Sequence, residues 1–544
     1  MVPLDPAPSA WLPLRRPVFR ALWIATLFSN LGTWVHGVGA AWLMTTLAPS
    51  PPMVAGVQAA TALPMFLLAL PAGALADVLD RRRILLASQG WMLVASAILG
   101  VLTQLERISP AGLLVLIFLM GVGAALNGPP WQAIVPALVP APELPAAVTL
   151  NSISFNIARA VGPAVGGLLV AAAGPGPTFL LNAASFLGVM AVLYRWRRPP
   201  SSSVLPAERF LGAMRTGLRY VRHAPEVQAI LLRGGLFLSC ASALWALLPL
   251  VARQRGAGPA GYGLLLGCLG AGAVLGALLL PRLRHRAPPQ GIVAAATLAF
   301  AAMLFAAAFE RWLPLLAAAL VIGGAAWLSL LSSLNVALQT VIPEWVRGRA
   351  LAVYMVVFFG AMSAGSLLWG AVAERVGLAG SLAAAGVGLL AGLAVTARFP
   401  LASGEGLDLA PSRQWPAPVV AYEFDREVGP VLVTVEYLVP AEKAERFAAA
   451  MAEMRRIRLR DGALQWGLFV DAADPERQVE VFLVKSWLEH LRQHERVTFA
   501  DLVVQQRARA FHAGSEPPAI RHLIAATPVP AAPAEEEKGT GRGR

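Results

Sequence analysis

Charged side chains are scarce in this 544-residue sequence. Asp, Glu, Lys and Arg make up 14% of it, about half the share found in soluble domains, while hydrophobic residues make up 57%. The mean hydropathy of the chain is +0.62. This composition excludes an ordinary soluble enzyme, a disordered chain and a protein that binds nucleic acid through a basic surface.

Residue patterns that bind metals, cofactors or nucleotides are also lacking. The two cysteines, Cys240 and Cys268, both lie in apolar stretches and form no disulfide framework or Cys/His metal motif. The sequence has no glycine-rich phosphate-binding loop, which argues against ATP-driven transport. We therefore predict no cofactor, no metal centre and no catalytic group.

The few charges are unevenly placed along the chain. Residues 1–400 hold 26 Lys and Arg but only 10 Asp and Glu, whereas residues 401–544 hold 18 and 21. The first part has the composition of a membrane protein and the second that of a soluble domain. A linker containing Gly, Ser and Pro, over 401–415, separates the two.

Apolar stretches long enough to cross a bilayer recur through the first part. A spanning helix needs about 20 apolar residues, and twelve stretches meet this length. They lie at 20–45, 53–76, 84–104, 111–132, 145–172, 176–195, 228–251, 261–281, 290–309, 313–338, 349–373 and 377–397. The sequence thus predicts an all-α membrane domain of twelve helices whose surroundings are the lipid bilayer.

Basic residues indicate how these spans are oriented. If the N-terminus lies in the cytoplasm, the loops on that side hold 16 arginines and the opposite loops hold 5. Loops rich in Lys and Arg stay on the cytoplasmic side of a membrane. We therefore predict a multi-pass protein of the bacterial inner (plasma) membrane with both termini in the cytoplasm.

Two stretches 203 residues apart resemble each other. Residues 139–167 align without a gap on 342–370, with identical residues at six positions. The identical pairs are Pro140 and Pro343, Ala147 and Ala350, Phe155 and Phe358, Ala158 and Ala361, Gly162 and Gly365, and Gly167 and Gly370. The repeat predicts two parallel six-helix halves, 1–195 and 228–400, joined by a cytoplasmic loop over 196–227. Such halves form secondary transporters that bind a substrate between them near the midplane.

The loop after the second span carries a motif, Gly73-Ala-Leu-Ala-Asp77-Val-Leu-Asp80-Arg-Arg-Arg. It resembles the Gly-x-x-x-Asp-x-x-Gly-Arg-Arg motif of the major facilitator superfamily, with Asp80 in place of the second glycine. The resemblance implies that Gly73, Asp77, Arg81 and Arg82 take part in gating. The carboxylate would pair with the other half when the inner gate is closed. The alternative is that the arginines only set the topology.

The fifth span carries a second motif. Gly162, Pro163, Gly166 and Gly167 resemble the Gly-Pro-x-x-Gly-Gly signature of antiporters in the same superfamily. We expect them to serve gating, since Pro in a glycine-rich stretch allows a kink at a packed interface. With the preceding Leu150-Asn-Ser run, they resemble the transmembrane secretion effector branch, which includes a bacterial enterobactin exporter. Over residues 15–400, this resemblance implies export of small amphiphilic, drug-like or siderophore-like compounds, with proton antiport as one driving force.

Arg159 is the main candidate for a substrate contact. It lies near the middle of the fifth span, and the twelve span interiors contain no Asp or Glu. A lone guanidinium within a membrane is costly and indicates a function. It could bind an anionic or catecholate-like substrate, or it could hydrogen-bond helix-end carbonyls and Asn side chains as a structural clamp.

Polar and aromatic residues of other spans complete the predicted site. The further candidates for substrate binding are Asn30, Trp34, Asn127, Asn156 and Asn335. Each of them could instead hold helices together or anchor the chain at the membrane interface. His36 could carry a proton between the two sides, or be a hydrogen-bonded structural group. The spans lack the carboxylate that many proton-coupled exporters of this superfamily have.

The tail alternates strand-like and helical patterns. Over 416–525 their order is β-α-β-β-α-β, which predicts a ferredoxin-like α+β domain. It resembles the small dimeric domain of antibiotic-biosynthesis monooxygenases, which implies self-association. Residues 526–544 are predicted to be disordered. His490 and His494 have a spacing that can chelate a metal, but no third ligand is apparent, and we interpret them as part of a solvated helix face.

Three functions remain open for the whole chain. The first is a secondary exporter, not an enzyme, whose tail regulates or dimerises it. The second is a membrane-tethered enzyme in which the tail performs cofactor-independent oxidation or haem chemistry and the spans deliver the substrate. The third is a transporter-like sensor that signals through its tail.

Overall fold

The computed structural model describes residues 11–196, 210–401, 408–412 and 425–526. The chain separates into two compact units. The membrane unit comprises Met1–Met214, Glu226–Thr340 and Leu351–Ser403, and the tail unit comprises Arg215–Pro225, Val341–Ala350 and Gly404–Arg544. The predicted disordered stretch from residue 527 onwards and most of the predicted linker lie outside the described residues.

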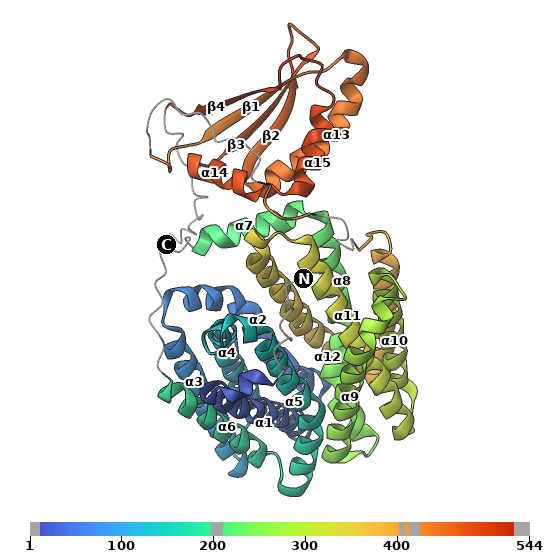
Figure 1. Cartoon of the computed structure of the whole chain (residues 1–544). Coiled ribbons are helices and arrows are strands. Elements are labelled where there is room, and N and C mark those ends of the chain that lie inside the picture. Colours follow the sequence, from blue (N-terminus) through green and yellow to red (C-terminus); the bar gives the residue numbers. More distant parts are fainter. Residues whose placement is uncertain (1–10, 197–209, 402–407, 413–424, 527–544) are drawn as a thin grey trace, which may run out of the picture. The chain divides into compact units, whose positions relative to one another are not determined.

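Long helices with short connections make up the membrane unit (Figure 1). They are α1 (Pro17–Leu47), α2 (Pro51–Val78), α3 (Arg81–Gln104), α4 (Pro110–Ile134), α5 (Leu144–Ala173), α6 (Gly176–Arg195), α8 (Pro225–Gln254), α9 (Gly258–Arg284), α10 (Pro289–Phe309), α11 (Leu313–Val341) and α12 (Glu344–Thr396). Each predicted span falls on one of these helices. Many of them begin with Pro in the first turn, where its missing N–H costs no hydrogen bond.

The structure does not give the predicted number of spans directly. Among the described residues, ten helices are long and apolar enough to cross a membrane, and α1 is not one of them. The polar stretch Ser29-Asn-Leu-Gly-Thr33 lowers the hydropathy of α1. The 53-residue α12 consists of two helices, because Gly377 has φ 79° and ψ 167°. The boundary between the predicted spans 349–373 and 377–397 lies at this point. The total of twelve spans stays a prediction.

The tail unit contains the predicted β-α-β-β-α-β order, with the second helical region divided in two. Its elements are β1 (Val431–Leu438), α13 (Ala444–Asp461), β2 (Ala463–Val470), β3 (Arg477–Val484), α14 (Trp487–Arg496), α15 (Phe499–Arg509) and β4 (Ala519–Ile524). The sheet is antiparallel with the order β2-β3-β1-β4. Figure 1 shows the helices gathered on one face of this sheet.

The core of the tail lies between the sheet and its helices. Alternate residues of β1, among them Val431, Val433 and Val435, point into it. From α13, Phe447 and Met451 are fully buried against them. The apolar side chains that recur at every second residue of β1 and about every fourth residue of α13 therefore form one apolar layer.

The tail unit also includes two short segments from residues 1–400, the part of the sequence with membrane composition. One is the end of helix α7 (Phe210–His223), which the sequence did not predict within the central loop. The other is Val341–Ala350, where α11 ends and α12 begins. The ring of Tyr220 lies edge-on to Trp345 with centroids 5.7 Å apart, and its hydroxyl donates to the Val341 carbonyl at 3.5 Å.

Candidate functional site

The predicted substrate site lies on two parallel helices, α1 and α5. The indole N–H of Trp23 donates to the Leu150 carbonyl at 2.9 Å. Further along, Trp34 lies edge-on to Phe155 with ring centroids 6.5 Å apart. The two helices are again in contact at Gly166 of α5, where an added Cβ would lie 3.0 Å from Cα of Val35 of α1. Both helices therefore run side by side through the region of Arg159.

Arg159 lies one turn after Phe155 and one turn before Gly162, and both of these residues contact Trp34. Its side chain is half-buried. Among the described residues, its guanidinium has no hydrogen-bond or ion-pair partner. A structural clamp requires such partners, whereas an anion-binding group would leave its donors available for a ligand.

The backbone of Arg159 lies where α5 meets α9. An added Cβ at Gly270 of α9 would lie 2.6 Å from the Arg159 carbonyl oxygen and 2.9 Å from Cα of Ala160. Because α5 and α9 belong to the two predicted halves, Arg159 lies at the level of their contact. This is where rocking transporters place their substrate.

The predicted asparagines have different surroundings. Asn127 accepts hydrogen bonds from Gln89 at 3.1 Å and from Ser88 at 3.3 Å, which joins α4 to α3. Asn156 donates to the Ser152 carbonyl of its own helix at 2.8 Å, and Asn335 of α11 accepts a bond from Gln339 of the same helix. Asn30 is half-buried one turn before Trp34. The structure thus brings Asn30, Trp34, Asn156 and Arg159 onto one helix pair, while Asn127 and Asn335 lie on other helices.

His36 is buried among three helices. The hydroxyl of Ser96 donates to the Phe179 carbonyl at 2.9 Å and lies 3.3 Å from Nδ1 of His36. The imidazole also packs edge-on against the ring of Phe179, with centroids 4.8 Å apart. These contacts are the ones expected of a structural histidine, and the proton-carrying role stays a prediction.

The loop motif has clear local functions at two positions. Asp80 caps α3, since its carboxylate accepts the Arg83 backbone N–H at 2.9 Å. Arg82 donates to the carbonyls of Leu193, at 2.7 Å, and Tyr194, at the C-terminal end of α6. Arginine at a helix C-terminus satisfies carbonyls that have no partner within the helix. The side chain of Asp77 lies outside the described residues.

The glycines of the fifth-span motif allow close approach between helices. An added Cβ would lie 2.6 Å from Cβ of Trp34 at Gly162, and 2.6 Å from the Pro259 carbonyl oxygen at Gly167. The first approach joins α5 to α1, and the second joins α5 to Gly263 and its neighbours on α9. The motif therefore packs two of its faces against other helices at once.

The repeat partner of Gly167 makes an equivalent contact. An added Cβ at Gly370 of α12 would lie 2.6 Å from Cβ of Ala55 and 3.2 Å from the Pro51 carbonyl oxygen, at the start of α2. Pro259, the neighbour of Gly167, likewise lies at the start of α9. The contact of α5 with α9 is thus matched by that of α12 with α2, as a two-fold relation between halves requires.

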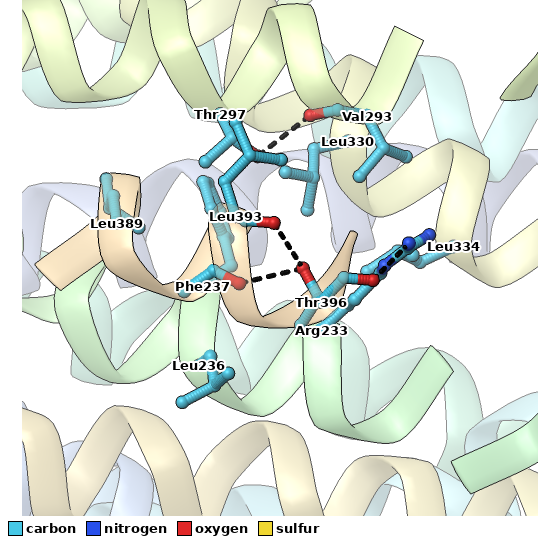
Figure 2. Close-up of a pocket in the computed structure, with 11 residues that line it drawn as sticks. Arg233, Leu236, Phe237, Val293, Thr297, Leu330, Leu334, Leu389, Leu393 and Thr396 are labelled. Atoms are coloured by element: carbon cyan, nitrogen blue, oxygen red, sulfur yellow. Dashed lines mark hydrogen bonds between the residues drawn. The ribbon is translucent and has the colours of Figure 1, made fainter. Parts of the chain in front are cut away.

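Arg233, one of the 16 arginines assigned to the cytoplasmic loops, has a specific role in the structure. Its guanidinium donates to the carbonyls of Thr396 and Phe399, both at 2.7 Å, and so caps the end of α12. Figure 2 shows this arginine beside a small cavity lined largely by leucines. The cavity of about 20 Å³ has room for about one water molecule, which is too little for a drug-sized substrate.

An ionic cluster dominates the part of the tail unit that holds α7. Glu489 of α14 accepts from Arg496 at 2.7 Å and from Arg219 of α7 at 3.0 Å. Burial alone would raise the pKa of Glu489, but the two guanidinium groups outweigh it and lower this pKa below its ordinary value. Nearby, Arg460 pairs with Asp461 and Asp501, both at 2.8 Å. Arg219 is one of the 16 arginines that the sequence assigned to the cytoplasmic loops, where it served only as an orientation signal.

Comparison with known proteins identifies the family. Residues 8–529 match the family described as transmembrane secretion effector. The chain belongs to this family. The match extends over the tail as well as the helices, and it confirms the resemblance to this branch of the major facilitator superfamily. The resemblance of the tail to monooxygenases stays a prediction.

Curated relatives of this transmembrane secretion effector are exporters by name. The enterobactin exporter EntS of Shigella boydii serotype 18 is 29% identical over 382 residues, which cover 69% of this chain and 89% of that protein. EntS of Escherichia coli O1:K1 / APEC is 28% identical over 382 residues, with the same coverage of both chains.

Solved structures share the fold of the helices. A bacterial homolog of the human lysosomal transporter Spinster, in an inward-facing and unoccupied conformation, has a TM-score of 0.57 at 16% identity and covers 71% of this chain and 98% of its own. The nucleoside transporter NupG has a TM-score of 0.57 at 12% identity, covering 70% and 99%. At these identities the likeness shows the fold alone, that of a multi-pass membrane transporter.

Proposed function

We propose that this chain is a secondary exporter of small anionic or amphiphilic compounds in the bacterial plasma membrane. It works by alternating access between two six-helix halves, with α1 and both parts of α12 completing twelve spans. Support comes from the matched close approaches at Gly167 and Gly370, which let two packed halves rock about one interface. The exporter names of the curated relatives favour the outward direction.

The observation that carries the proposal is the half-buried guanidinium of Arg159, which lacks a partner among the described residues. A charge in this position is costly unless a counter-charge arrives with the ligand. A carboxylate or catecholate would supply two acceptor oxygens in the geometry that a guanidinium fork matches. Trp34 would stack against the apolar part of the ligand, and Asn30 and Asn156 would add polar contacts beside it.

Transport through this site requires a gate and a driving force. We assign gating to the loop residues Gly73, Asp77, Arg81 and Arg82, and to the glycine-proline motif of α5. Proton antiport is the driving force that we propose, and His36 is its candidate carrier. The tail would then regulate transport instead of catalysing a reaction.

The test is accumulation of anionic siderophores, dyes and antibiotics in cells that express the protein, with and without a protonophore. We expect wild type to lower accumulation of an anionic compound. Arg159→Gln should reduce this effect at least tenfold, while Arg159→Lys should retain part of it. The matched control is Arg375→Gln, which removes an exposed arginine of the membrane unit.

The outcomes separate the parts of the proposal. If Arg159→Gln exports as well as wild type at equal membrane abundance, the substrate role of Arg159 is wrong. If wild type moves no anionic compound but exports neutral or cationic ones, the substrate class is wrong and the exporter function stands. If the protonophore leaves export unchanged, proton antiport is excluded.

We also propose that the tail unit self-associates through the outer face of its sheet. Leu432, Leu483 and Leu523 lie in register across β1, β3 and β4. They alternate with core residues such as Val431 and Val433, so they point away from the helices. Leu523 is 52% exposed. A row of leucines on an open sheet face suits a second copy of the same face.

A further inference from the structure

Three histidines of the tail unit converge although they come from two elements. His490 and His494 lie one turn apart on α14, and His522 lies on β4. One ring nitrogen from each lies within 4.8 Å of the other two. Only the α14 pair can be recognised from the sequence, because the pairing of β4 with β1 brings His522 to this pair. In that pairing His522 lies opposite Val433, a core position, so its side chain is on the helix-covered face.

The spacing within the group suits a metal ion. Nε2 of His490 and Nε2 of His494 lie 3.2 Å apart. Two nitrogens bound to one tetrahedral Zn²⁺, each about 2.05 Å from it, lie about 3.3 Å apart. The α14 pair therefore has the required separation. The ring nitrogen of His522, which lies within 4.8 Å of the other two, must approach them by up to about 1.5 Å to complete the set.

The surroundings orient the candidate ligands. Nδ1 of His490 lies 3.4 Å from Oε1 of Gln493. In the tautomer that donates a proton to this oxygen, Nε2 of His490 presents its lone pair to the other histidines. The ring of Trp487 forms an apolar wall, with its centroid 5.5 Å from His490 and 5.8 Å from His522. This is the usual arrangement of a metal-binding histidine, held by a second hydrogen bond and an apolar shell.

Access and charge also permit an ion. His490 is only 1% exposed, whereas His494 and His522 are half-buried and open a route from solvent. The positive charge of Arg458 acts on His490 and His494. Arg458 is paired with Glu480, whose carboxylate accepts from it at 2.9 Å, and this pairing reduces the repulsion that a bound divalent ion would meet.

We propose that His490, His494 and His522 bind a divalent transition-metal ion, with Zn²⁺ as the best fit. Three neutral imidazoles suit Zn²⁺, Ni²⁺ and Cu²⁺ and disfavour Mg²⁺ and Ca²⁺, which take oxygen ligands. Three protein ligands leave a fourth position for water or another ligand. The bound ion would fasten α14 to β4, and α14 is also the helix whose Glu489 pairs with Arg219 of α7.

The experiment uses the full chain, purified in detergent with a tag that contains no histidine and stripped of metal with a chelator. Zn²⁺ is titrated against a chromogenic competitor, and bound zinc is counted by mass spectrometry. We expect one Zn²⁺ per chain. His494→Gln and His522→Gln should each weaken binding at least tenfold, and Gln493→Leu about tenfold, the effect of losing a supporting hydrogen bond. His285→Gln removes an exposed histidine outside the cluster and should bind as wild type.

Two results of the Zn²⁺ titration would overturn the proposal. One is the absence of saturable binding by wild type. The other is equal affinity in the His494, His522 and His285 variants, which would place the ion elsewhere. If a cluster variant fails to fold, as judged by circular dichroism, Co²⁺ bound to wild type decides the question. The intense visible absorption of four-coordinate Co²⁺, lost on adding one equivalent of Zn²⁺, supports the site, and the weak spectrum of six-coordinate Co²⁺ contradicts it.

Discussion

Arg219 of α7 and Glu489 of α14 form an ion pair at 3.0 Å, although 270 residues separate them in the sequence. Both side chains are largely shielded, with 23% and 14% of their surface exposed. Glu489 also accepts from Arg496 at 2.7 Å, so one carboxylate serves two guanidinium groups. Such a shielded, shared carboxylate contributes more to stability than an exposed ion pair does. Removing it leaves two cations close together without a counter-charge. The pair links the tail to the segment that leads directly into α8.

The first prediction concerns this link. Glu489→Gln removes the charge that both arginines share, and we expect it to loosen the part of α7 within the tail unit. Amide hydrogen exchange over 215–223 in the full chain should become about tenfold faster, which corresponds to about 1.4 kcal/mol. The matched control is Glu445→Gln, which changes an exposed glutamate of α13. Equal exchange in both variants would show that the ion pair does not hold α7.

The second prediction is the pH dependence of the same link. The pKa of Glu489 is lowered from its ordinary value of 4.5, so the folded carboxylate stays charged after the unfolded one has taken up a proton. Its stabilisation is therefore fully present above about pH 4.5 and is lost as pH falls through the lower folded pKa. Three arginines face this carboxylate, namely Arg219, Arg492 and Arg496.

The measurement compares exchange over 215–223 in wild type and Glu489→Gln from about pH 6 to about pH 3. The ratio of the two rates cancels the intrinsic effect of pH on exchange. It should be constant above about pH 4.5 and approach one at the acid end. Burial raises the pKa of Asp461, which titrates in both proteins, so its effect on the exchange rates also cancels in the ratio. A ratio that does not change with pH would contradict the assignment to Glu489.

Local patterns predicted much of the fold because they need no partner. Apolar length located the helices, and the alternation of Val431, Val433 and Val435 located β1. Gly377, with its left-handed backbone, marks the division of α12 that two adjacent apolar runs had indicated. The order of elements in the tail follows from the same kind of signal.

Features that depend on distant partners could not be predicted in this way. His522 becomes a candidate ligand only because β4 pairs with β1. The structural role of Arg219 is recognised only from its ion pair with Glu489. The helix α7 was missed because its many arginines were interpreted as an orientation signal. Asn127 and Arg159 were both predicted from the sequence to contact the substrate. The structure distinguishes them, because Asn127 bonds to Gln89 whereas Arg159 has no bonding partner among the described residues.

The third prediction concerns the two matched glycines of the membrane unit. Gly167→Ala and Gly370→Ala each place a Cβ 2.6 Å from an atom of a facing helix, closer than packed atoms approach. We expect each variant to lose about 1–3 kcal/mol of stability through overpacking. In transport assays, each should also slow export, because the helices that must rock are forced apart. Thermal unfolding in detergent measures the first effect.

The control for these variants is Gly37→Ala on α1, where an added Cβ would meet no atom of the described residues within 4 Å. Since Ala is favoured over Gly in a helix by about 1 kcal/mol, this variant should be as stable as wild type or more so. If Gly167→Ala and Gly370→Ala behave like Gly37→Ala, close approach is not required at those positions. If only one of them destabilises the protein, the two-fold relation between the halves loses its support.

The fourth prediction concerns the outer face of the tail sheet. Leu523→Arg places a charge in the row formed with Leu432 and Leu483, where a second copy would have to bury it without a partner. We expect the full chain in detergent to be dimeric and this variant to dissociate at least tenfold more readily, as measured by mass photometry over a dilution series. Val503→Arg is the matched control, since Val503 is 54% exposed on α15, one of the helices that cover the opposite face of the sheet. Dimers that survive Leu523→Arg but not Val503→Arg would move the interface to the helices, and a wild-type chain that stays monomeric at every concentration would exclude self-association.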